Sequence, residues 1–414
     1  MSHSNKLNNI IIFAILYLSL IIGFLFGENS SGGAVSDFNL RISIINEFIT
    51  NFEFAFFNYN TLGDRHSPVL PIIISIIQKL GFELSEIRFL HIHLLPLIIF
   101  FSYKCLVIKF SNVEKKILFL LTCVFFISPI MRSTAIWPDS RILGLLLFII
   151  SLFFFLKFKK KKKLNHCIYN NIALVLSSYV SPNFSIFFIF FFYHYFLFYK
   201  ISYKIFVILI INFLFAVPMI VYLFILEINF LIKPVDGDAA NTLVRLNLSN
   251  KILIISSLIF FYLLPIIISI NFKKKFLEFF KIKYALYTFI LTVILVLFFN
   301  YQVSFTGGGI IFKLSHVLFN NSYLFYLFSF ISLIIIFTFF KSNTNNLLIF
   351  IVLIISNPQL TIYHKYYDPL LILLFLLSFE FKFNIAEYLN KKLLIYIYVF
   401  YSLFLSANFL RFLI

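Results

Sequence analysis

Long apolar runs separated by short polar segments make up most of this 414-residue chain. The runs approach roughly 20 residues, the length that a helix needs to cross the hydrocarbon core of a bilayer. Charged residues are 12% of the chain, about half the share found in soluble domains. We therefore predict an all-α fold, a polytopic transmembrane helical bundle that forms a single integral membrane domain over residues 1–414. About 13 spans are expected, at residues 8–26, 89–109, 116–131, 140–157, 168–180, 183–199, 204–226, 252–271, 283–300, 322–340, 346–357, 368–381 and 391–411.

The polar interval at residues 27–88, between the first two spans, has an amphipathic pattern of its own. Apolar residues recur at helical spacing over residues 41–57 with Asn and Glu on the other face, which predicts a helix lying in the membrane interface. A second interface helix is predicted over residues 67–80, with Ser67 as its N-cap and Gly81 at its end.

Charge divides the connecting segments into two classes. The chain carries 34 basic and 16 acidic residues, for a net charge of +18. Of these, 22 basic and only four acidic residues fall in short lysine-rich connectors and span ends, which the positive-inside rule assigns to the cytoplasm. This rule accounts for the basic residues without a nucleic-acid partner, and it places the N-terminus inside and the C-terminus outside. The chemically varied segments then face outward, at residues 27–88, 131–139, 227–251, 301–321 and 358–367.

The N-terminal span and the cysteines fit this picture of a membrane protein. Residues 8–26 are interpreted as a retained signal anchor, because no small-residue cleavage site follows them; a cleaved signal peptide is the alternative. Two of the three cysteines fall in spans and one follows a lysine run, so no disulfide framework is predicted. We expect an integral protein of a bacterial cytoplasmic (inner) membrane, with its site on the outer face.

Ionisable residues gather in the first outer segment. Asp37 is a candidate catalytic base or metal ligand, with a helix-capping carboxylate as the structural alternative. Arg41 follows one turn later, and Arg65 and His66 next to Asp64 are suited to contact a phosphate. For Asp64 the alternative is a turn residue with solvated neighbours. Asp37 and Asp64 each precede a predicted helix, where the dipole favours anions.

Two further pairs flank the next spans. Arg88 and His91 are one helical turn apart at the outer mouth of the second span, where ionisable groups are functional candidates. Snorkelling of the Arg88 side chain to the interface is the alternative. Asp139 and Arg141 open the fourth span next to Trp137, and helix capping is the alternative for them.

The later outer segments add other candidates. His364 and Lys365 lie among three tyrosines at the start of the twelfth span, where a lysine could face a lipid phosphate. The Asp-Gly-Asp sequence at residues 236–238 lacks the remaining ligands of a calcium loop. The glycines at residues 307–309 are either a phosphate-approaching turn or a flexible loop.

Together these groups suit an enzyme that acts on a lipid phosphate-linked sugar at the membrane surface. Such chemistry needs a carboxylate to accept a proton and cations, or a metal, to hold the departing phosphate. Four segments carry a family resemblance, namely SDFNLR at 36–41, GDRHSPVLPIIISIIQKLG at 63–81, WPDSRILGLLLFIISLFFFL at 137–156 and YHKYYDPLLILL at 363–374. In this order they resemble the polytopic glycosyltransferases of the GT-C class, in particular the protein mannosyltransferase and aminoarabinose-transferase-like branch.

The resemblance implies an inverting glycosyltransferase that moves a sugar from a polyprenyl-phosphate donor to a glycan, lipid or protein acceptor. By position it gives Asp37 the catalytic carboxylate, Arg41 a phosphate contact, His66 the place of a basic residue before a proline pair, and Lys365 a place near a late arginine. Metal use varies across the class, so a divalent cation is open. Ser67 replaces the first proline of the pair, and no second acid follows Asp37.

Other classes of protein stay as alternatives. A lipid-linked glycan flippase or transporter would place ionisable groups in mid-span along a pathway. An O-antigen-polymerase-like protein would rely on arginines in a long late loop, and a structural or receptor role is a further alternative.

Overall fold

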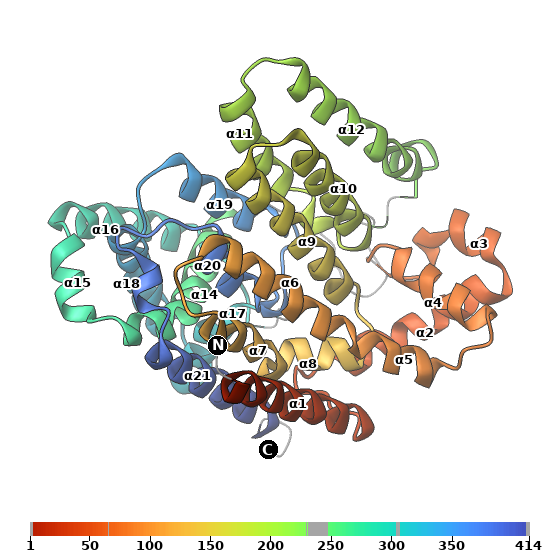
Figure 1. Cartoon of the computed structure of the whole chain (residues 1–414), viewed down its shortest axis with the longest axis horizontal. Coiled ribbons are helices and arrows are strands. Elements are labelled where there is room, and N and C mark those ends of the chain that lie inside the picture. The colour runs from red at the N-terminus through yellow and green to blue at the C-terminus, as the bar shows by residue number, and fades with distance from the viewer. Residues whose placement is uncertain (1–2, 65, 229, 231–246, 304–306, 411–414) are drawn as a thin grey trace. The chain divides into compact units, whose positions relative to one another are not determined.

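The computed structural model describes residues 3–64, 66–228, 230, 247–303 and 307–410. Helices connected by short turns make up this described part (Figure 1). It contains no strand beyond an isolated bridge between Phe340 and Phe381. The predicted all-α class is therefore confirmed.

The chain forms two compact units, unit 1 with residues 1–235 and 398–414 and unit 2 with residues 236–397. Unit 1 contains α1 (His3–Leu25), α2 (Ala34–Thr50), α3 (Phe52–Phe57), η1 (Tyr59–Thr61), α4 (Val69–Lys79), α5 (Leu84–Ile92), α6 (Leu94–Lys109), α7 (Lys115–Cys123), η2 (Val124–Ile127), α8 (Pro129–Ile136), α9 (Ser140–Lys161), α10 (Leu164–Val180), η3 (Pro182–Phe184), α11 (Phe187–Tyr199), α12 (Tyr203–Ile220) and η4 (Val221–Ile225). Unit 2 contains α14 (Leu248–Ser269), α15 (Phe272–Phe279), α16 (Ile282–Leu297), α17 (Gly309–Phe319), α18 (Tyr323–Phe339), α19 (Thr344–Ile355), η5 (His364–Tyr366), α20 (Leu370–Leu377) and η6 (Ile385–Tyr388). The last helix, α21 (Lys391–Leu410), begins in unit 2 and continues in unit 1.

Several of these helices have the length and composition of membrane spans. The described residues hold seven such helices, at Asn8–Leu25, Leu84–Lys109, Ser140–Lys161, Pro182–Tyr199, Tyr203–Ile225, Leu248–Ser269 and Lys391–Leu410. The number rises to nine if each of two bent pairs crosses as one span, Lys115–Ile127 with Pro129–Ile136 and Phe272–Phe279 with Ile282–Leu297. The chain is thus a helical protein with several spans, and the expected count of about 13 stays a prediction.

The first predicted interface helix, over residues 41–57, is wrong in its start. α2 begins seven residues earlier, at Ala34, whose backbone N–H donates to Asn29 Oδ1 at 3.1 Å. Asp37 consequently lies in the first turn of α2 and does not precede the helix.

The same predicted helix is also interrupted. Asn51 leaves the helical conformation, with φ −142° and ψ 85°, and its side-chain oxygen accepts a hydrogen bond from Phe54 N at 3.0 Å. This cap ends α2 and starts α3. The second interface helix, α4, begins at Val69, one residue later than Ser67 as N-cap predicts, and Val69 N donates to Ser67 Oγ. Its end agrees with the prediction, because Gly81 adopts a φ of +99° that favours glycine.

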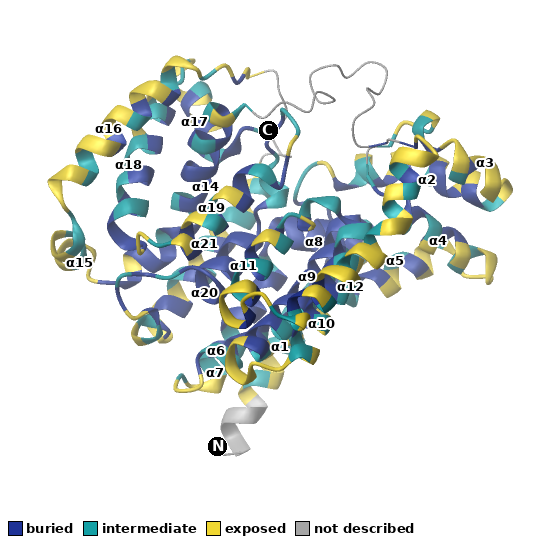
Figure 2. Cartoon of the chain, turned by 90° about the horizontal axis from the view of Figure 1, so that it is seen from above, coloured by how far each residue is buried: buried dark blue, intermediate teal, exposed yellow. Residues whose placement is uncertain are grey.

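Three predicted outer segments contain more helix than expected. The segment at 131–139 is mostly α8, which Ser128 caps by accepting from Met131 N at 3.2 Å. The segment at 227–251 contains the start of α14, and the segment at 301–321 contains α17. Burial distinguishes the helices: residues along α9 are mostly buried, whereas α15 and α16 expose much of their surface (Figure 2).

Candidate functional site

The turn between α8 and α9 receives basic side chains from two other elements of unit 1. Arg41 Nη1, from α2, donates to Pro138 O at 3.2 Å. Arg88 Nε, from α5, donates to Ile136 O at 3.2 Å, and the Nδ1 atom of His91 lies 2.9 Å from Ala135 O. The carbonyls of Ala135 and Ile136 belong to the last turn of α8, where they have no partner within the helix, and Pro138 O lies in the turn itself. The α8–α9 turn is therefore the point at which α2 and α5 are held together.

Arg41 is the centre of a buried group of charges that we call the junction cluster, made of Arg41, Asp64, Asp139 and Arg141. Arg41 Nη1 lies 3.5 Å from Asp139 Oδ2, and its Nε lies 3.6 Å from Asp64 Oδ2. Arg141 Nη2 lies 3.5 Å from the same Asp139 oxygen. Arg41 and Asp139 are 3% and 2% exposed, so these charges interact with little screening by water. The sequence segments at 36–41, 63–81 and 137–156 thus meet in one place.

Each carboxylate of the cluster has a second structural role. Asp139 caps α9, because its Oδ1 accepts a hydrogen bond from Arg141 N at 2.9 Å. Helix capping was the structural alternative given for this residue in the sequence. Asp64 Oδ1 accepts from His66 N at 2.9 Å and lies 2.7 Å from His66 Nδ1. When Nδ1 carries the proton of that contact, Nε2 is the ring nitrogen left to face a ligand.

Electrostatic effects keep Arg41 and Asp64 ionised. Burial would lower the pKa of Arg41, but Asp139, Asp64 and Asp37 outweigh it and raise the pKa above its usual value. Burial would raise the pKa of Asp64, but the charge and hydrogen bonds of His66 and the charge of Arg41 hold that pKa well below its usual value. Arg41 and Asp64 therefore keep their charges across the physiological pH range.

Asp37 lies at the edge of this cluster. It is one helical turn before Arg41 on α2, is partly exposed, and its charge contributes to the raised pKa of Arg41. Arg88, also partly exposed, stacks over Trp137, with 3.6 Å between the guanidinium carbon and the ring centroid. His91 is 8% exposed, and its Nε2 atom has no hydrogen-bond partner among the described residues.

The remaining predicted site residues belong to unit 2 or lie outside the described residues. His364 and Lys365 belong to unit 2, where the Nε2 atom of His364 is hydrogen-bonded to the Tyr262 hydroxyl and Lys365 Nζ lies 5.1 Å from the Tyr363 ring centroid. Burial and the charge of Lys313 lower the pKa of His364 to about 3, so its imidazole is neutral at physiological pH. Arg65 and residues 236–238 lie outside the described residues.

Sequence reasoning missed a buried ion pair beside the cluster. Glu28 and Arg132 are 9% and 5% exposed, and Arg132 Nε lies 2.7 Å from Glu28 Oε1. Arg132 Nη2 also donates to Ser19 O, within α1, at 2.9 Å. An arginine at the end of a predicted apolar span was the available signal, because a charge there needs a partner.

The described residues contain no group of metal ligands, and the comparisons with known proteins give no match. Within the ranges that the structure describes, no three His, Cys, Asp or Glu side chains are grouped as metal ligands, so the divalent cation stays open. Comparisons with protein-family models, curated proteins and solved structures find no match. The resemblance to the GT-C class stays a prediction from the sequence.

Proposed function

We propose that this chain is an inverting glycosyltransferase that uses a polyprenyl-phosphate sugar at the outer face of a bacterial cytoplasmic membrane. The observation that carries the proposal is the junction cluster, which brings three of the four resembling segments together around Arg41. A partly exposed carboxylate, Asp37, and a partly exposed imidazole, His66, lie at the borders of this fixed charge arrangement.

The roles follow from exposure and hydrogen bonding. Asp37 accepts the proton of the acceptor hydroxyl. The oxygen of that hydroxyl attacks the anomeric carbon from the face opposite the phosphate. The bond from that carbon to the phosphate oxygen breaks, and its electron pair leaves with the polyprenyl phosphate. His66 Nε2 and Arg88 contact the phosphate, while Arg41 positions the segments that carry Asp37 and His66, because its own N–H groups are engaged with Asp64, Asp139 and Pro138 O.

The test is transfer of a radiolabelled sugar from polyprenyl-phosphate donors in membranes that contain the chain. Asp37→Asn should lower transfer by a factor of about 10² to 10⁴, the usual contribution of a general base. Glu53→Gln, which changes an exposed acid on α3, is the matched control and should transfer at the wild-type rate. Undiminished transfer by Asp37→Asn removes Asp37 from the mechanism.

Binding can be measured apart from transfer because Trp137 is the single tryptophan of the chain and lies against Arg88. Donor titrations should change its fluorescence equally in wild type and in Asp37→Asn. Arg88→Ala should weaken the donor titration.

A lipid-linked glycan transporter is the second candidate, favoured by the buried Glu28–Arg132 pair beside the α1 span. Movement of labelled donor across proteoliposomes without sugar transfer would favour it over the enzyme.

A further inference from the structure

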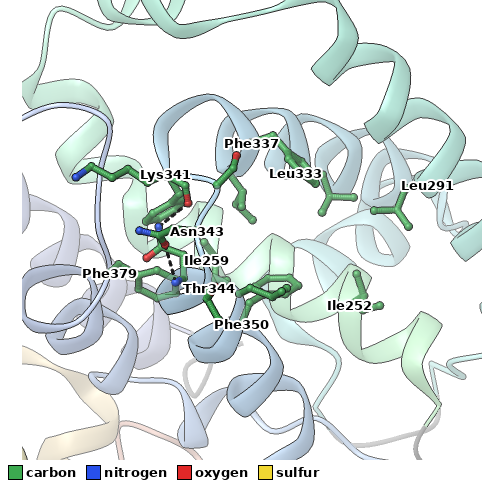
Figure 3. Close-up of a pocket in the computed structure, with 15 residues that line it drawn as sticks. Ile252, Ile259, Leu291, Leu333, Phe337, Lys341, Asn343, Thr344, Phe350 and Phe379 are labelled. Atoms are coloured by element: carbon green, nitrogen blue, oxygen red, sulfur yellow. Dashed lines mark hydrogen bonds between the residues drawn. The ribbon is translucent and has the colours of Figure 1, made fainter. Parts of the chain in front are cut away.

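Unit 2 contains a pocket that shares no residue with the junction cluster. Its volume is about 530 Å³, within the 300–1,000 Å³ range of ligand pockets. Its walls come from α14, α16, α18 and α19, the turn between α18 and α19, and Phe379 (Figure 3). Ile252 and Ile259 both line it, so it extends over two turns of α14, roughly 10 Å.

The two ends of the pocket differ in chemistry. Figure 3 shows Lys341, Asn343 and Thr344 at one end and Leu291 and Ile252 at the other. The Lys341 side chain is 54% exposed, and its Nζ lies 3.7 Å from Glu380 Oε2. Such a weak, hydrated contact leaves the ammonium able to contact another anion.

Hydrogen bonds fix the polar end. The Asn346 side chain donates to Lys341 O at 2.9 Å and to Glu380 O at 2.8 Å, and Asn343 Oδ1 accepts from Asn346 N at 3.0 Å. A second ammonium lies at this end, because Lys382 Nζ donates to the carbonyl of Phe337, a wall residue, at 2.7 Å. Of these two lysines, Lys341 contacts Glu380, whereas Lys382 Nζ also donates to the Tyr284 hydroxyl at 3.4 Å.

We propose that this pocket binds an anionic phospholipid of the bilayer, with part of one acyl chain among the apolar residues and the phosphate at Lys341. Charge complementarity selects an anionic headgroup, since basic residues near a membrane surface attract anionic lipids. The site goes beyond the proposed function, and no step of sugar transfer depends on it.

Native mass spectrometry of the full chain, delipidated in detergent, tests this proposal. Phosphatidylglycerol and phosphatidylcholine with the same acyl chains are compared at equal concentration. Wild type should retain one phosphatidylglycerol in preference, and Lys341→Gln should weaken that binding about fivefold and remove the preference. Lys391→Gln, at an exposed lysine of unit 2 outside the pocket, should change neither.

A second pair of variants tests the apolar end. Leu347→Trp narrows the pocket at a residue that is 58% exposed, and it should reduce binding of both lipids. Leu286→Trp, at a residue of α16 that is 57% exposed and does not line the pocket, is the control. Equal binding by Leu347→Trp and wild type, equal effects of Lys341→Gln and Lys391→Gln, or preferential retention of a polyprenyl phosphate would each overturn the proposal.

Discussion

Arg41 shows which electrostatic effect dominates in the junction cluster. Taking a guanidinium out of water costs several kcal/mol, and one carboxylate at 3.5 Å offsets only part of that cost. Asp64 and Asp139 together, with the hydrogen bond to Pro138 O, make the charged state the stable one. The cluster therefore depends on all its members, because removing one charge leaves an opposite charge buried without its partner.

Replacement of Arg41 should reveal this dependence. Arg41→Met leaves Asp64 and Asp139 buried without their shared cation and should lower the free energy of unfolding by about 3–5 kcal/mol. The double variant Arg41→Met, Asp64→Asn should recover much of the loss, because Asp64 no longer carries a buried charge and Asp139 keeps Arg141 as its partner. Denaturant unfolding in detergent measures both, and an unchanged stability of Arg41→Met would show that the cluster contributes nothing.

Asp64 should impose a pH dependence on stability. Burial raises its pKa, but His66 and Arg41 more than offset this, so the folded-state pKa lies below the usual 3.8. A carboxyl whose pKa is lowered by folding stabilises the protein at pH values above its unfolded-state pKa. This contribution is lost as the pH falls toward its folded-state pKa.

The quantity to measure is the difference in the free energy of unfolding between wild type and Asp64→Asn. The difference should shrink as the pH falls below about 4, by roughly 1–2 kcal/mol at pH 2.5. Other carboxyls titrate in both proteins and largely cancel in the difference. Glu53→Gln, at an exposed acid, should show no such trend, and a wild-type advantage that persists unchanged at pH 2.5 would contradict the assignment.

At the residue scale, the sequence indicated most members of the cluster but not their partners. Asp139 and Arg141 stood at a helix start, and Asp64 and His66 stood before another, so their positions were readable. The Arg41–Asp64 and Arg41–Asp139 contacts join segments 23 and 98 residues apart, and no local pattern specifies such pairings. Tyr59, whose hydroxyl donates to His66 O at 3.0 Å, gave no signal in an aromatic-rich chain.

At the element scale, the link from α1 to α2 is fixed by the Glu28–Arg132 pair, and a glycine makes room for it. A Cβ on Gly23 of α1 would lie 2.2 Å from Glu28 Oε2 and 2.8 Å from Arg132 Nη2. The ion pair thus occupies the space that a larger residue of the helix would need.

A double-mutant cycle tests that arrangement. Gly23→Ala should destabilise the wild type by about 1–3 kcal/mol, because the carboxylate must move away from Arg132. In a Glu28→Ala background the same change should be neutral or stabilising by up to about 1 kcal/mol, since alanine is the better helix former. Gly33→Ala, whose added Cβ meets nothing within 4 Å, is the control; equal effects of Gly23→Ala in both backgrounds would exclude the steric explanation.

The break between α2 and α3 shows why element boundaries were harder to predict than the elements. Asn51 fits the polar face of a continuous amphipathic helix as well as it fits a cap. Periodicity does not distinguish the two, because the side chain satisfies either pattern and only its bond to Phe54 N decides.

At the scale of the whole molecule, hydropathy predicted the helical membrane class but not the direction of each helix. α7 and α8 bend by 65° across Ser128, and α15 and α16 bend by 88° between them. Hydropathy sums apolar residues along the chain and is the same for a straight and a bent path, so the count of spans does not follow from it.

Orientation in the membrane is the last prediction, and cysteine labelling tests it. Cys105, Cys123 and Cys167 are all buried, so a membrane-impermeant maleimide should leave the wild type unlabelled in intact cells. The positive-inside rule then predicts labelling of Asn46→Cys, on an exposed face of α2, without permeabilisation. Asn112→Cys, exposed in the connector after α6, should be labelled only after permeabilisation. The reverse pattern would place Asp37 and the junction cluster on the cytoplasmic side, and a sugar donor at the outer face could not reach them.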